Sequence, residues 1–175
     1  MKRVLTVALA IAMAASVGVG VAMARAGGTQ FVVRTQGTEN FEKNALVYAT
    51  LRFAPQVIQV PTGGTLLFVK RDDAPDEPHT LSIVTKGQLP TSIDEVFNCI
   101  VCNKILGEHF PPNSQPVLKV DRDGDGGLNA DGDSIMVLPG VNTKISVVIT
   151  APAGTTLHYL CAFHPWMQAT IQVTS

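Results

Sequence analysis

The chain has 175 residues, of which 46% are hydrophobic and 15% are charged, with 13 basic and 14 acidic side chains. This length fits a single domain, and the composition excludes a disordered or highly charged protein. The near balance of charge, without a basic stripe, also excludes nucleic acid as an expected partner.

The N-terminal residues have the pattern of a secretory signal peptide. Lys2 and Arg3 precede an uncharged run, 4–24, and small residues follow this run. We expect residues 1–26 to be cleaved, which predicts an exported protein, periplasmic or extracellular. The alternative is a retained N-terminal anchor, because the run is long enough to cross a bilayer. Without residues 1–26, the remaining chain carries 10 basic and 14 acidic side chains.

Short apolar runs, punctuated by glycine and proline, fill most of residues 27–175. Several of them alternate apolar and polar residues, as in 145–149, which is typical of strands with one buried face. All 11 prolines follow position 54, which argues against a helical bundle. Many short strands at this spacing predict an all-β, antiparallel sandwich or barrel. The predicted strands are 30–34, 45–53, 56–60, 65–70, 79–84, 117–120, 134–138, 144–150, 156–162 and 170–174.

Residues 86–133 depart from this strand pattern. A hydroxyl cap at Ser92, followed by Asp94 and Glu95, predicts the start of a helix that continues to about Leu106. An Asp- and Gly-rich loop follows. The segment is too short to build a core of its own, so we interpret it as an insertion between two strands of the single domain, 27–175.

Three side chains with affinity for soft metals occur within seven residues near the C-terminus. Cys161, His164 and Met167 have the spacing C-x2-H-x2-M, directly after a predicted strand. A thiolate, imidazoles and a weak thioether form the ligand set of a blue-copper electron-transfer centre. This set needs a second imidazole, and the candidate is His79, which is predicted to begin a strand after a proline-bearing loop. The alternative, a buried cysteine among core residues, requires all these features to coincide by chance.

These motifs resemble those of the cupredoxins, the blue type 1 copper proteins of the plastocyanin and amicyanin kind. The resemblance extends over most of 27–175, apart from the insertion. It implies a Greek-key β-sandwich with one copper at its end, ligated by His79, Cys161, His164 and Met167. The matching segments, in chain order, are 53–55, 58–61, 64–65, 67–68, 78–81, 138–140 and 161–167.

The resemblance implies an exported one-electron carrier between redox partners, and not an enzyme. The sequence has four histidines, so His109 and His158 alone cannot build a second catalytic copper cluster. The alternative function is a copper-binding module for storage, delivery or sensing, which would use the same ligands but release the metal. We expect transient partners to dock near His164 and Trp166; alternatively, the Trp166 ring only shields copper from water.

Two features of the insertion remain open from the sequence alone. Cys99 and Cys102 either form a disulfide, as an oxidising compartment favours, or remain a dithiol or a soft-metal site with His109. Asp121, Asp123 and Asp125 resemble the first half of a calcium loop, but position 12 lacks the bidentate glutamate. This stretch is therefore either a structural calcium site or a solvated Asp/Gly turn.

Overall fold

The computed structural model describes residues 30–140 and 142–175, so the predicted signal peptide, residues 1–26, lies outside the described residues. The strands are β1 (Phe31–Gln36), β2 (Glu39–Glu42), β3 (Leu46–Ala49), β4 (Arg52–Ala54), β5 (Val57–Pro61), β6 (Thr65–Val69), β7 (His79–Val84), β8 (Lys119–Val120), β9 (Gly127–Leu128), β10 (Ser134–Val137), β11 (Lys144–Ile149), β12 (Thr156–Leu160) and β13 (Gln168–Thr174). The helices are η1 (Lys86–Gln88, a 3-10 turn), α1 (Ile93–Phe97) and α2 (Ile100–His109).

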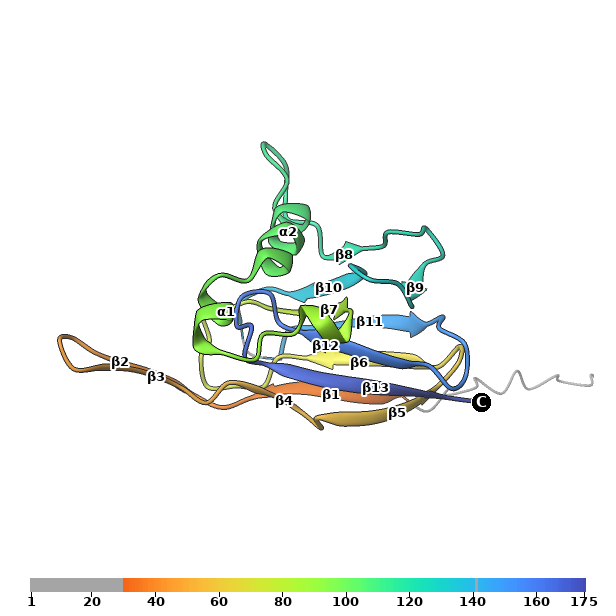
Figure 1. The fold of residues 1–175 in the computed structure, drawn as a ribbon, viewed down its shortest axis with the longest axis horizontal. Helices are drawn as coiled ribbons and strands as arrows, with labels where there is room; N and C mark the ends of the chain where they lie inside the picture. The colour runs from red at the N-terminus through yellow and green to blue at the C-terminus, as the bar shows by residue number, and fades with distance from the viewer. Residues whose placement is uncertain (1–29, 141) are drawn as a thin grey trace, which may run out of the picture.

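The strands form two layers that pack face to face (Figure 1). One sheet has the strand order β4-β1-β6-β11-β9, and the other has the order β5-β13-β12-β7-β10-β8. Many neighbours in a sheet are distant in the chain, as Greek-key connections require. The pairs β1–β6, β5–β13 and β9–β11 are parallel, which the alternation of residues alone did not reveal. The layers confirm the predicted all-β sandwich with a helix-containing insertion.

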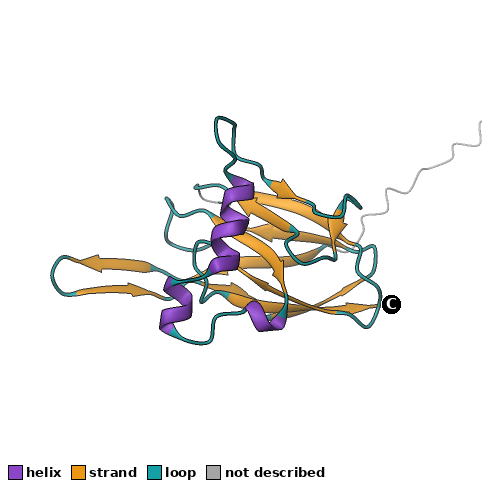
Figure 2. Ribbon diagram, turned by 45° about the horizontal axis from the view of Figure 1, so that its top comes forward, coloured by secondary structure: helices purple, strands orange, loops and turns teal. Residues whose placement is uncertain are grey.

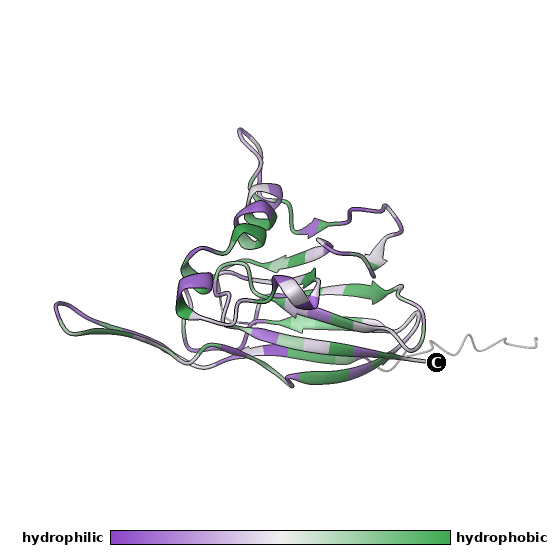
Figure 3. Cartoon of the chain, viewed as in Figure 1, coloured by the Kyte–Doolittle hydropathy of each residue, from purple (hydrophilic) through white to green (hydrophobic). Residues whose placement is uncertain are grey.

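The inner faces of both sheets share one hydrophobic core. Hydrophobic and hydrophilic residues alternate along several strands (Figure 3), which is how a strand buries one face and exposes the other. The ring of Phe53 lies 4.9 Å from the ring of Tyr159, between the layers. Other buried members of this core are Val33, Leu66, Phe68, Leu81, Ile135, Ile149 and Ile171.

The predicted single strand 45–53 is wrong, because the chain there forms two strands, β3 and β4. The first of these pairs with β2 in a hairpin that projects beyond the sandwich (Figures 1 and 2), so Val47 and Tyr48 remain exposed. The Thr50 N–H donates to the Thr38 carbonyl at 2.9 Å, and the Thr38 N–H donates to Thr50 Oγ1 at 2.9 Å. These bonds close the base of the hairpin and end the run that the sequence presented as continuous.

A glycine is required at the entrance to this hairpin. Gly37 has a φ of +113°, and a Cβ atom there would lie 2.3 Å from the carbonyl oxygen of Thr50. A side chain would therefore prevent the close approach of the two backbone segments.

The insertion contains two short helices in place of the one predicted from the periodicity. Ser92 caps α1 as predicted, with its Oγ accepting from the Glu95 N–H at 3.2 Å. This helix, however, ends at Phe97. Cys99 is the N-cap of the second helix, α2, and its Sγ accepts from the Cys102 N–H at 3.3 Å. The apolar periodicity in the sequence therefore continues across the boundary between two helices.

The insertion packs on the outer side of one sheet through a small second core. Its members come from β7, α2 and the end of β12: Val84, Cys99, Cys102, Ile105, Leu160 and Ala162. The short strands β8 and β9 also extend the two sheets by pairing with β10 and β11. Among the described residues, no helix is both long and apolar enough to cross a membrane.

Candidate metal centre

Strand β7 brings His79 to one end of the sandwich. His79 is the first residue of this strand, opposite Val137 in β10, and its side chain is fully buried. Pro78 precedes it, and proline favours an extended conformation at the residue before it and cannot donate a hydrogen bond to the sheet. His79 directly follows the loop 70–78, and its ring is buried between the sheets.

The connection between β12 and β13 supplies the other predicted ligands. Alternation along β12 turns Leu157, Tyr159 and then Cys161 into the core, as the sequence predicted. The Cys161 N–H donates to the Met167 carbonyl at 3.0 Å, and the Met167 N–H donates to the His164 carbonyl at 2.8 Å. These two bonds fold the loop back on itself, so a sequence spacing of seven residues becomes one cluster.

The predicted thiol and both imidazoles converge in the structure. Cys161 Sγ lies 3.8 Å from Nδ1 of His79 and 3.7 Å from Nδ1 of His164. The ligand atoms of these three residues lie within 4.8 Å of one another, and all three side chains are buried. Met167 is 1% exposed and belongs to the same core. This donor set, dry and facing inward through Nδ1 and sulfur, fits a type 1 copper ion.

The surroundings of the Cys161 thiol favour its ionised form. Burial alone opposes ionisation, but the imidazoles of His164 and His79 lower the pKa of this thiol to about 6. The Thr80 N–H points at the sulfur, 3.4 Å away. The Thr80 hydroxyl accepts from the Ala162 N–H at 2.7 Å and so ties β7 to the ligand loop. A thiolate at neutral pH is the form that binds a metal.

The outward nitrogens of the two imidazoles both face carboxylates. Nε2 of His79 lies 3.0 Å from Asp72 Oδ2, an off-axis contact at ion-pair distance, and both side chains are fully buried. Nε2 of His164 lies 3.4 Å from Glu77, which is more than one-third exposed. Burial opposes protonation of His79, yet its contacts with Asp72 and Cys161 raise its pKa to about 9.

Sequence reasoning missed Asp72 and its buried partner, Lys70. A signal for Lys70 was present, because the period of two in β6 places it on the same face as the core residues Leu66 and Phe68. Asp72 had no such signal, since it lies in a loop beside the similar residue Asp73.

Trp166 combines features of both roles considered from the sequence. Its ring is 42% exposed and lies 5.2 Å from the His164 ring, while Nε1 donates to the Leu51 carbonyl at 3.2 Å. The ring is therefore held against the site and still presents a surface to solvent.

Of the alternatives left open by the sequence, the structure shows the disulfide: Cys99 and Cys102 are bonded to each other, so neither is a free thiol or a metal ligand. The ring nitrogens of His109 have other partners: Nδ1 contacts the Val117 carbonyl at 2.5 Å, and Nε2 contacts Ser134 Oγ at 2.7 Å. Both ring nitrogens thus hold the end of α2, one to the segment that precedes β8 and the other to β10.

The calcium hypothesis gains no support from the geometry of the aspartate loop. Asp121 and Asp123 lie near Asp133, but the third predicted ligand, Asp125, bonds instead with the Gly127 N–H and Asn129. The oxygens of Asp121 accept from two backbone N–H groups of the same loop, at 2.8 and 2.7 Å. The carboxylates thus act as turn-forming groups.

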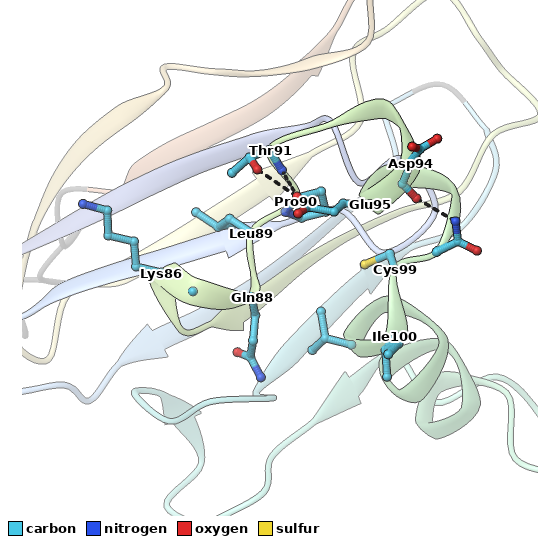
Figure 4. A pocket seen from close by; sticks show the side chains of 12 residues that line it. Lys86, Gln88, Leu89, Pro90, Thr91, Asp94, Glu95, Cys99 and Ile100 are labelled. Carbon is cyan, nitrogen blue, oxygen red and sulfur yellow. Dashed lines mark hydrogen bonds between the residues drawn. The ribbon is translucent and has the colours of Figure 1, made fainter.

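A pocket of about 570 Å³ lies away from the metal centre, between η1 and the helices α1 and α2 (Figure 4). The Glu95 carboxylate on its wall accepts from the N–H and the hydroxyl of Thr91, at 2.6 and 2.8 Å. The side-chain amide of Asn98 donates to the Asp94 carbonyl at 2.8 Å. These polar groups cap and brace α1, and we assign the pocket no function.

No protein-family model matches the chain, and no curated protein matches it in sequence. Similar solved structures include auracyanin A, a "blue" copper protein from Chloroflexus aurantiacus, with 14% identity over 83% of this chain and 100% of that one, at a TM-score of 0.44. A purple cupredoxin from Nitrosopumilus maritimus has 12% identity over 82% of this chain and 99% of that one, at 0.43. Amicyanin from Paracoccus versutus has 14% identity over 82% of this chain and 80% of that one, at 0.38.

The chain is structurally similar to auracyanins and amicyanins, and its buried His79–Cys161–His164 group resembles a type 1 copper site.

Proposed function

We propose that the protein is a mononuclear type 1 copper protein that carries one electron at a time between redox partners and transforms no substrate. One observation carries this proposal: a buried thiol lies 3.8 and 3.7 Å from the inward nitrogens of two imidazoles, beside a buried methionine. Bound copper would supply the one-electron couple Cu(II)/Cu(I).

The chain's own residues limit rearrangement at this site. His79 is held in a strand, and Cys161 follows one directly, while backbone bonds within the ligand loop fix Met167 and His164. Ligands that keep their positions in both oxidation states favour fast electron transfer. The thioether of Met167 is assigned the weak axial role that tunes the reduction potential.

An absorption spectrum of the copper-loaded, oxidised protein tests this function. We expect an intense visible band from thiolate-to-copper charge transfer and reversible voltammetry with the metal retained over many cycles. A protein that stays colourless with Cu(II) bound contradicts the proposal. Ready loss of Cu(I) to a weak chelator favours the alternative, a module for copper storage, delivery or sensing.

For the route of the electron, we assign the exit to the edge of His164, next to Trp166. The Trp166 ring is partly exposed beside this imidazole, and Phe163 lies in the same loop. Transient redox partners need little buried area. Trp166→Lys should keep the visible spectrum and slow electron exchange with the physiological partner, whereas Phe97→Lys, an exposed change on α1, should alter neither.

Export completes the proposal. The N-terminal pattern of residues 1–26 and the Cys99–Cys102 disulfide both suit a periplasmic or extracellular protein, with a retained anchor as the alternative. The mass of the protein isolated from its native host tests whether these residues are removed.

A further inference from the structure

Behind His79 lies a pair of opposite charges that is fully removed from solvent. The side chains of Lys70 and Asp72 are 1% and 0% exposed, and Lys70 Nζ lies 2.6 Å from Asp72 Oδ1. Burying two charges is costly unless good geometry and additional hydrogen bonds compensate for the lost water. Such a pair next to a metal ligand calls for an explanation beyond stability.

Neighbouring groups form hydrogen bonds with both Lys70 and Asp72. Lys70 Nζ also donates to the Ala74 carbonyl at 2.6 Å. Asp72 Oδ1 accepts additionally from the Ala74 N–H at 3.1 Å, and Oδ2 accepts from the Thr35 hydroxyl. The remaining contact of Oδ2, at 3.0 Å, is with Nε2 of His79. The carboxylate is therefore fixed in position beside the imidazole, in an off-axis contact at ion-pair distance.

We propose that Asp72 is a positioning residue for His79 and that, with Lys70 as its counter-charge, it lowers the reduction potential of the copper centre. The inference rests on the proposed function. A carboxylate at the outward nitrogen of a ligating imidazole fixes the ring orientation and raises its basicity as a ligand. A stronger donor favours the more positive oxidation state, Cu(II).

The two charges act on His79 with opposite signs, and their distances decide which dominates. The carboxylate contacts the ring through Oδ2, whereas the Lys70 ammonium contacts the other carboxylate oxygen, Oδ1. Because the interaction energy of two charges falls with distance, Asp72 has the larger effect and Lys70 reduces it.

The other imidazole has no equivalent support. Its carboxylate neighbour, Glu77, is 37% exposed and lies 3.4 Å from Nε2 of His164, where solvent screens the charge. The two histidines thus differ in electrostatic environment: the carboxylate beside His79 is buried and fixed, whereas the carboxylate beside His164 is partly exposed to solvent.

The test is voltammetry of copper-loaded Asp72→Asn and Lys70→Met, with visible spectra recorded alongside. Asp72→Asn should raise the midpoint potential, and Lys70→Met should lower it, while both proteins keep the intense visible band. Asp73→Asn is the matched control, because it removes the same charge from an exposed position of the same loop. It should leave the potential close to that of the wild type.

A purely structural pair would produce a different pattern. It would lower the melting temperature of the metal-free variants without shifting the two potentials in opposite directions. A coloured Asp72→Asn protein with the potential of Asp73→Asn overturns the inference and leaves the proposed function intact. A wild type that stays colourless with Cu(II) overturns the proposed function itself.

The single variants leave one buried charge unpaired and can fail to fold. The double variant Lys70→Met with Asp72→Asn removes both charges and avoids this problem. Its potential should lie above that of the wild type, because the nearer charge dominates. A double variant with the wild-type potential overturns the inference.

Discussion

The metal end of the sandwich and the insertion both contain cysteine, histidine and aspartate, yet the structure uses these residues in opposite ways. At the metal end, the nitrogens of His79 and His164 and the sulfur of Cys161 converge on one buried point. In the insertion, Cys99 and Cys102 form a disulfide with each other, and both ring nitrogens of His109 contact oxygen atoms of neighbouring residues. A metal centre depends on donors left free to converge, and not on the types of residue present.

Among the described residues, the two regions meet through apolar packing. The small core around the disulfide includes Leu160 and Ala162, which flank Cys161, and Phe110 at the end of α2 lies 6.0 Å from Phe163 of the ligand loop. The insertion thus supports the outside of the ligand loop and contributes none of the predicted ligands. Changes in the insertion should affect stability, and changes at the metal end should affect colour and potential.

Replacement of cysteine by serine in each region should give the largest contrast in visible absorption. Cys161→Ser should abolish the intense visible band of the copper-loaded protein, because the charge-transfer donor is lost. Cys99→Ser with Cys102→Ser should keep the band, since neither sulfur faces the site. Absorption spectra of both proteins check the prediction, and loss of colour in the insertion variant would contradict the separation of the two regions.

Within the metal end, Met167→Leu should keep the colour and raise the reduction potential. Leucine preserves the apolar volume but removes the weak sulfur donor to Cu(II). Voltammetry measures the shift. A protein that loses its colour would show that Met167 does more than tune the site.

Loss of the disulfide should lower the free energy of unfolding. The closed loop is short, so the chain-entropy estimate for Cys99→Ser with Cys102→Ser is a loss of about 2 kcal/mol in the free energy of unfolding. Urea denaturation of the metal-free protein measures it, with reduced wild type as the matched comparison. Equal stability of oxidised and reduced wild type would contradict the prediction.

His109 should give the insertion a dependence on pH. Burial lowers its pKa below the usual 6.5, while the Val117 carbonyl partly opposes this shift. The stabilising contribution of the neutral ring is therefore complete above pH 6.5 and declines as the pH falls toward the folded-state pKa. His109→Gln should be less stable than wild type at pH 7.5, and the difference should narrow at pH 5.5. Urea denaturation at the two pH values checks this, and a constant difference would contradict it.

The smallest expected effect concerns the aspartate loop. Asp121, Asp123 and Asp125 already accept hydrogen bonds from their own loop, so calcium should change the melting temperature of the wild type very little. A rise of several degrees, absent in Asp123→Ala, would instead restore the calcium interpretation.

Sequence alone was sufficient for features that depend on local pattern. The alternation of apolar and polar residues identified most strands, because a strand in a sandwich buries one face. The spacing of Cys161, His164 and Met167 predicted that these three donors share one loop, because they lie within seven residues of one another. The Ser92 cap followed from hydrogen bonding within four residues.

Tertiary structure decided the features that depend on distant partners. The apolar run 45–53 gave no indication of its break, which Gly37 and Thr38 impose from a neighbouring segment. The parallel pairing of β1 with β6 depends on the packing of whole sheets. Asp72 had no role visible in the sequence. The alternation that places Lys70 on the core face did not reveal its partner, because a charge is stable inside a protein only where the fold brings its partners together.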